Sequence, residues 1–237
     1  MFGLSRWAKH ASSFFKQLSE STSETDTTPS GQKSSLRTAS IFSVPRDTIQ
    51  VLDVSGSMGS PDYPPTRLDG GIQAATEYAT ARMKQSQNDR IAVVSFNDAA
   101  QVVLPLTPIA DRKTIIMAIR RLTAGGGTDI AVGLWAAAGI FANEPQSNRQ
   151  RHIIVLTDGQ GGRPLKIANK LKKEYCVVID VVGIGGSPGD VNESLLRKLA
   201  TTDSDGFCHY RYIKDPQTLS EHYRQLAKGI VWRGRGK

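Results

Sequence analysis

Cysteine, histidine and long apolar segments are scarce in this sequence of 237 residues, and each scarcity excludes a class of protein. The two cysteines, Cys176 and Cys208, are too few and too far apart for a disulfide framework or a zinc site. We expect both to be reduced thiols in the core. The four histidines are scattered, and their placement suggests no catalytic trio of Ser, His and acid.

The sequence also lacks the patterns that are typical of a membrane-spanning helix and of a secretory signal. No stretch approaches the roughly eighteen consecutive apolar residues that a membrane-spanning helix needs. The amino-terminal segment MFGLSRWAKHASSFFKQL lacks the continuous apolar core and the small-residue cleavage site of a secretory signal. These absences predict a cytoplasmic protein.

Basic residues exceed acidic residues by eight, and part of this excess lies near the two ends of the sequence. Residues 1–46 hold six Lys or Arg against three Asp or Glu, and the last sixteen residues hold five Lys or Arg. Basic surfaces attract nucleic acids and anionic membranes. However, no nucleic-acid-binding motif and no alternation of basic with aromatic residues accompanies the charge, so we do not expect a nucleic-acid partner.

Composition divides the chain near residue 46. Apolar residues between Leu4 and Leu18 recur at steps of three and four, which predicts an amphipathic helix over residues 1–18 with a basic polar face. Twelve of the 22 residues from Ser19 to Ser40 are Ser or Thr, so residues 19–46 are expected to form a flexible linker. The apolar stripe of the helix has three candidate surfaces: its own domain or a second copy, a groove of a partner, or an anionic bilayer.

Short apolar runs alternate with helical stretches from residue 47 to residue 230, and a basic tail follows at residues 231–237. We expect strands at residues 48–53, 90–96, 152–158, 176–185 and 207–214, and helices at residues 68–84, 111–122, 129–142, 164–174, 193–200 and 218–230. Residues 101–106 follow a tight Asn97-Asp98 turn and are expected to form an antiparallel edge strand. The predicted fold is a doubly wound α/β domain with a mostly parallel six-stranded sheet and helices on both faces.

Oxygen-bearing side chains gather at three points of this predicted domain. The first strand ends at Asp53, with Ser55 and Ser57 just beyond it, a glycine loop leads to Thr128, and the third central strand ends at Asp158. Because doubly wound sheets bind ligands beyond the carboxyl ends of their strands, we expect these side chains to lie close together. Oxygen ligands suit Mg²⁺, Mn²⁺ or Ca²⁺ and not zinc, and hydroxyls combined with two carboxylates suit Mg²⁺ best.

These five residues resemble the metal-ion-dependent adhesion site of von Willebrand factor A (vWA) domains. The resemblance implies that Ser55, Ser57 and Thr128 ligate the metal directly, while Asp53 and Asp158 act largely through coordinated water. It also implies that an Asp or Glu from another protein completes the coordination. Since the direct ligands are mostly neutral, the cation would keep much of its attraction for that carboxylate.

The order of the expected strands and helices matches vWA domains over about residues 48–230. In its short length the chain is also similar to stand-alone bacterial cytosolic vWA proteins. Some of those proteins are associated with kinase and phosphatase partners. Asp129 is expected to cap the helix after the glycine loop and to orient Thr128. Tyr63 and Arg163, in loops near the site, are the expected specificity contacts, because Tyr and Arg are frequent at the centres of interfaces.

Three classes of function remain open at this point. The favoured one is a metal-dependent protein-interaction module in a signalling or assembly complex, without enzymatic activity. The second is a Mg²⁺-dependent hydrolase or phosphoryl-transfer enzyme, for which no general base is apparent. The third is an anchoring protein that its amino-terminal helix localises, with peripheral membrane contact through residues 4–18.

Overall fold

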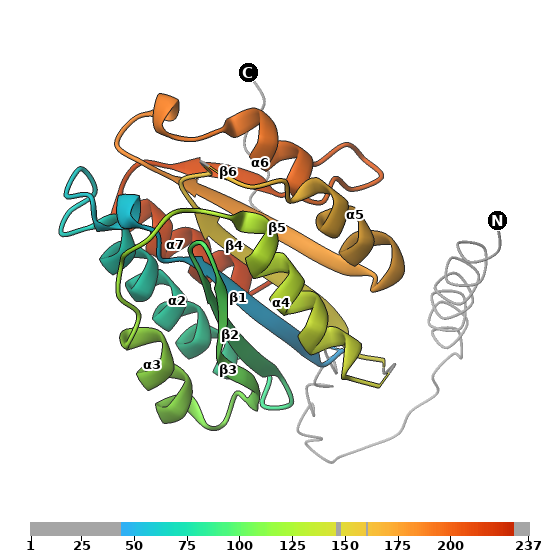
Figure 1. Ribbon diagram of the computed structural model, residues 1–237. Helices are drawn as coiled ribbons and strands as arrows, with labels where there is room; N and C mark the ends of the chain where they lie inside the picture. The colour runs from blue at the N-terminus through green and yellow to red at the C-terminus, as the bar shows by residue number, and fades with distance from the viewer. Residues whose placement is uncertain (1–43, 146–147, 160, 230–237) are drawn as a thin grey trace, which may run out of the picture. The chain divides into compact units, whose positions relative to one another are not determined.

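A six-stranded sheet forms the centre of the computed structural model, which describes residues 44–145, 148–159 and 161–229. Its strands are β1 (Arg46–Asp53), β2 (Arg90–Phe96), β3 (Ala100–Pro108), β4 (Gln150–Thr157), β5 (Val177–Ile184) and β6 (Tyr210–Ile213). The strands lie in the order β3-β2-β1-β4-β5-β6 (Figure 1). All neighbouring pairs are parallel except β2 and β3, which confirms the predicted antiparallel edge strand.

Helices cover both faces of this sheet. Figure 1 shows α4 in front of the strands and α7 behind them. One face is covered by α2 (Arg67–Met83), α3 (Arg112–Arg120) and α7 (Pro216–Ala227), and the other by α4 (Ile130–Ala142), α5 (Leu165–Glu174) and α6 (Glu193–Leu199). Alternate residues of a strand point to opposite faces, so the apolar runs of the strands fill two separate buried clusters. The predicted fold class is confirmed.

The edge position of β3 explains how its sequence is tolerated. Pro105 lies inside this strand and cannot donate a backbone hydrogen bond, but an edge strand needs donors on one side only. The last helix begins two residues earlier than predicted, at Pro216, because Asp215 caps it by accepting a hydrogen bond from the Thr218 amide. Proline is well suited to the first position of a helix, where its missing N–H leaves no bond unmade.

The order of the strands places the predicted site. From β1 the chain builds the sheet first on the β2 side and later on the β4 side, so the topology switches between β1 and β4. Leu52 of β1 is the register partner of Leu156 of β4, which brings the ends of the two strands together. A ligand site is expected at this point in doubly wound sheets.

Some of the sequence-based expectations concern residues outside the described ranges, and others need correction. The predicted helix over residues 1–18, most of the linker and the basic tail lie outside the described residues. Within the described ranges, no helix combines the length and the apolar character that crossing a bilayer requires. Both cysteines are free, as predicted, but their expected core positions are wrong. Cys176 is exposed and Cys208 half-buried, because both lie just outside the strands that the apolar runs form.

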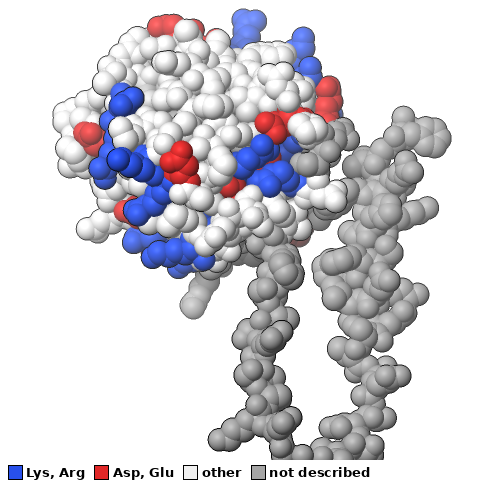
Figure 2. Space-filling view, turned by 90° about the horizontal axis from the view of Figure 1, so that it is seen from below, with Lys and Arg blue, Asp and Glu red and all other residues white. Residues whose placement is uncertain are grey.

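Basic and acidic side chains lie near one another on one face of the domain. On the face shown in Figure 2, Lys and Arg side chains lie in several clusters with acidic side chains beside them. On this face, acidic side chains therefore interrupt the basic clusters.

Candidate metal site

The end of β1 provides the first three side chains. Asp53 is its last residue and is fully buried, and one of its carboxylate oxygens accepts a hydrogen bond of 2.8 Å from the Ser55 amide. A short 3-10 helix, η2 (Gly56–Gly59), follows and carries Ser57. The hydroxyl oxygens of Ser55 and Ser57 lie 3.1 Å apart. The turn therefore places two hydroxyls beside a buried carboxylate.

The end of β4 provides the second carboxylate. Asp158 follows the strand directly and is fully buried. Its Oδ2 accepts a hydrogen bond of 3.2 Å from Arg67, whereas its buried Oδ1 has no hydrogen-bond partner within the described structure. The preceding Thr157 donates from Oγ1 to Asp53 Oδ2 over 2.6 Å, which ties the two strand ends together. Sequence reasoning missed Thr157, although its place before Asp158 was a usable signal.

The glycine loop approaches this pair of strand ends. The Gly56 amide donates to the Gly126 carbonyl over 2.9 Å, so the loop lies against the turn after β1. Gly126 has φ of +81°, a conformation that favours glycine. On the other side of the loop, a Cβ on Gly161 would lie 2.0 Å from the Thr128 carbonyl oxygen, so only glycine allows this close approach. The loop thus brings half-buried Thr128 between the segments that carry the other site residues.

Asp129 begins the helix that follows the loop. Its side chain accepts a hydrogen bond of 2.9 Å from the Ala131 amide, which confirms the predicted cap of α4. Its own amide donates to the Asn97 carbonyl over 2.8 Å. The Asn97 side chain in turn donates to the Gly125 carbonyl over 2.9 Å, so the loop after β2 supports the glycine loop.

The electrostatics of the site favour a cation. Burial raises the pKa of Asp53 to about 6, hydrogen bonds from Ser55 and Thr157 oppose this rise, and the neighbouring Asp158 carboxylate adds to it. Two buried carboxylates thus share a small volume with hydroxyl groups. Among the described residues there is no cluster of three or more His, Cys, Asp and Glu, so a cation here would need the hydroxyls as ligands. This set of oxygen ligands fits Mg²⁺ and not zinc.

Residues 48–160 match the family model of the von Willebrand factor type A domain. This matched segment contains all five residues of the candidate site. The type A structure from Catenulispora acidiphila has a TM-score of 0.62 to this chain at 25% identity, covering 78% of this chain and 42% of that one. The match in both sequence and fold includes the ends of β1 and β4, where the candidate site lies.

Two relatives show how far the similarity of this chain extends. A protein of Synechocystis described as uncharacterized is 29% identical over 189 residues, covering 77% of this chain and 41% of the relative. The calcium-activated chloride channel regulator 1 of Bos taurus is 29% identical over 179 residues, covering 75% of this chain and 18% of the relative. The chain therefore spans less than half the length of these relatives.

Arg67 joins three loops around the candidate site. This nearly buried side chain at the start of α2 forms ion pairs with Asp62, with Asp158 over 3.2 Å and with Asp190 over 3.3 Å. The guanidinium of Arg67 holds the pKa of Asp62 well below its usual range. Sequence reasoning missed Arg67. The available signal was a cation in the first turn of a helix, where the helix dipole disfavours positive charge.

The predicted specificity contacts differ in their exposure. Tyr63 is fully buried in the core, and its ring packs so closely on α2 that a Cβ on Gly70 would lie 2.6 Å from it. The expectation that Tyr63 contacts a partner is therefore wrong, because its apolar ring is more stable in the core than on the loop surface. Arg163 is exposed, so its role in partner binding stays a prediction.

Proposed function

We propose that this chain carries a von Willebrand factor type A domain, which binds Mg²⁺ through Asp53, Ser55, Ser57, Thr128 and Asp158 and uses the ion to bind a carboxylate of another protein. The observation that carries this proposal is the buried Oδ1 of Asp158, which has no hydrogen-bond partner within the described structure. An unpaired oxygen of a buried carboxylate is costly unless a cation or a donor satisfies it. A metal ion held by the Ser55 and Ser57 hydroxyls would satisfy it through a coordinated water.

The ligand types determine what such an ion can do. The hydroxyls of Ser55, Ser57 and Thr128 are neutral ligands, and Asp53 and Asp158 would act largely through coordinated water. When bound, the ion would keep enough attraction to take an Asp or Glu of the partner as its last ligand. Asp129 would keep Thr128 oriented from the start of α4. Mn²⁺ and Ca²⁺ are the alternative ions that oxygen ligands accept.

The proposed setting is a cytoplasmic signalling or assembly complex, with kinase or phosphatase proteins among the candidate partners. Exposed Arg163 would contribute to partner choice. We propose an interaction module and not an enzyme, because both site carboxylates are needed to hold the ion. Incubation with generic phosphoesters and Mg²⁺ separates the two functions, since only a hydrolase or phosphoryl-transfer enzyme releases product.

Calorimetric titration with Mg²⁺ tests the metal site. Asp53→Ala and Asp158→Ala should each abolish Mg²⁺ binding while the sheet stays folded, as circular dichroism would show. Glu174→Ala is the matched control, because this exposed carboxylate on α5 forms only a distant surface pair with Lys170. Undiminished Mg²⁺ affinity in both site variants would rule out the proposed site.

Affinity purification tests the use of the ion. Proteins captured in Mg²⁺ and released by EDTA should disappear from the eluate when Asp158→Ala replaces the native chain. Capture that survives both the chelator and this variant would contradict a metal-dependent interaction.

A further inference from the structure

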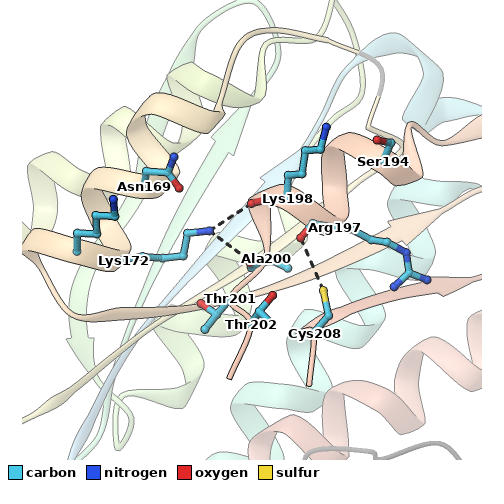
Figure 3. A pocket seen from close by; sticks show the side chains of 10 residues that line it. Asn169, Lys172, Ser194, Arg197, Lys198, Ala200, Thr201, Thr202 and Cys208 are labelled. Carbon is cyan, nitrogen blue, oxygen red and sulfur yellow. Dashed lines mark hydrogen bonds between the residues drawn. The ribbon is translucent and has the colours of Figure 1, made fainter. Parts of the chain in front are cut away.

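A groove between α5 and α6 has a volume of about 720 Å³ and is lined by basic and hydroxyl-bearing side chains (Figure 3). Lys172 and Lys173 contribute from α5, and Arg197 and Lys198 from α6. No Asp or Glu is among the described residues that line it. The groove is therefore a concentrated positive region separate from the candidate metal site.

Lys172 links the two helices that form the walls of the groove. The Lys172 amino group donates to the carbonyls of Lys198, Leu199 and Ala200 over 3.2, 3.3 and 3.1 Å. Figure 3 shows this side chain reaching from α5 to the end of α6. A cation at the carboxyl end of a helix satisfies its last carbonyls and its dipole. Lys172 thus holds the two walls together and is not free to bind a ligand.

Two other lysines are available. Lys173 and Lys198 are exposed. Within the described structure, neither amino group forms a hydrogen bond or an ion pair. Arg197, by contrast, pairs with Glu193 over 2.6 Å. The groove therefore presents one uncompensated ammonium group from each helix, with the Ser194 and Thr202 hydroxyls and the Asn169 amide as further polar groups.

We propose that this groove binds an acidic peptide segment of a partner protein. Protein phosphate sites favour helix amino termini and backbone amides, whereas the helix end at this groove is the carbonyl end of α6, already capped by Lys172. Ammonium groups on flexible stems, flanked by hydroxyls, suit the carboxylates of Asp and Glu side chains. Binding here needs no metal ion, so it is independent of the proposed Mg²⁺ site.

The groove is nevertheless connected to that site through a packing contact. Leu196 of α6 packs against Gly159, where a Cβ would lie 2.9 Å from its side chain, and Gly159 directly follows Asp158. The two surfaces thus belong to one packed unit, and a single acidic partner has two distinct places to contact it.

Fluorescence anisotropy in EDTA with a labelled Glu-rich decapeptide tests the proposal. The double variant Lys173→Glu, Lys198→Glu should weaken peptide binding at least tenfold. The matched control is Arg112→Glu, Lys113→Glu, which makes the same charge change at exposed positions of α3 and should leave binding within about twofold. Equal weakening by both double variants would overturn the proposal, because it would show a general charge effect.

The two cysteines locate the bound peptide. Cys208 lines the groove, whereas Cys176 is exposed outside it. Saturating peptide should slow alkylation of Cys208 by iodoacetamide at least fivefold and leave Cys176 unaffected. Unchanged alkylation of Cys208 would overturn the proposal. An oligothymidine that binds more tightly than the peptide and protects Cys208 better would also overturn it, in favour of a nucleic-acid groove.

Discussion

Buried carboxylates lie at both ends of the parallel strands, but the groups around them differ. At the amino ends, Asp47 pairs with Arg90 over 2.7 Å and with Arg149 over 2.7 Å, and Asp89 pairs with Arg82. At the carboxyl ends, the hydrogen-bond donors to Asp53 are the Ser55 amide and the Thr157 hydroxyl. The carboxylates at the amino ends are neutralised within the fold, whereas Asp53 is held by neutral groups.

This difference distinguishes the carboxylates that stabilise the fold from those that can bind a ligand. Arg82 also donates to the Ala227 carbonyl over 2.9 Å, so its pair with Asp89 locks α2 to the end of α7. At the other end, Arg67 neutralises Asp158 only in part, because it is shared with Asp62 and Asp190 and leaves Oδ1 unpaired. A carboxylate whose charge is already matched contributes to stability, and one that is incompletely matched has affinity left for a ligand.

The largest expected effect is at the amino ends. Arg82→Met should lower the free energy of unfolding by about 3–5 kcal/mol, because Asp89 would stay buried without its counter-charge. Denaturation in urea measures this loss. The double variant Arg82→Met, Asp89→Leu should recover part of the stability, since no buried charge is then left alone. A loss below about 1 kcal/mol in the single variant would mean that the amino-end pair is not structural.

Metal removal should have the next largest effect, at the carboxyl ends. With Mg²⁺ at a hundred times its dissociation constant, the folded protein should gain about 2.7 kcal/mol over protein in EDTA. Asp158→Asn should abolish this gain, while Arg82→Met should keep it, because Arg82 lies at the opposite end of the strands. Urea denaturation with and without Mg²⁺ measures both. Stabilisation by Mg²⁺ that persists in Asp158→Asn would place the ion elsewhere.

A smaller effect is expected at the glycine loop. Thr128 is the neutral ligand from this loop, so Thr128→Ala should weaken capture of the partner about tenfold, or roughly 1.4 kcal/mol. Its effect on Mg²⁺ affinity should be smaller, within about threefold. Titrations of Mg²⁺ and of the captured partner compare the two. Equal losses would show that Thr128 serves the ion alone and has no separate role in partner binding.

Deletion of residues 2–18 should have the smallest effect on the ion pairs at the amino ends of the strands and on the candidate metal site at their carboxyl ends. Stability and Mg²⁺ affinity should stay within about 0.5 kcal/mol, as for surface changes away from the core. Partner capture and the share of protein in the membrane fraction should fall, because the predicted helix would serve as a docking element. If both are unchanged and the helix proves packed on its own domain, the anchoring hypothesis is wrong.

The sequence predicted the strands well because burial on both faces leaves a simple signal, a short run of Val and Ile. It placed β1, β2, β4 and β5 within a few residues of their positions, and glycine and polar residues marked their ends. It was less reliable for loops. Tyr63 lies in a Pro-rich loop, yet it is fully buried, because its packing partner Gly70 is found in the following helix.

By itself, the sequence determined the type of ligand groups at the candidate site, because residue identity fixes the chemistry of Asp53, Ser55 and Ser57. It also determined that these groups follow strands, since hydrophobic periodicity is local. Only the tertiary structure decided which carboxylates are neutralised. Asp158 and its cation Arg67 are 91 residues apart, and Asp53 and Thr157 are 104 apart. Such pairings depend on strand order and helix packing, and no local pattern encodes them.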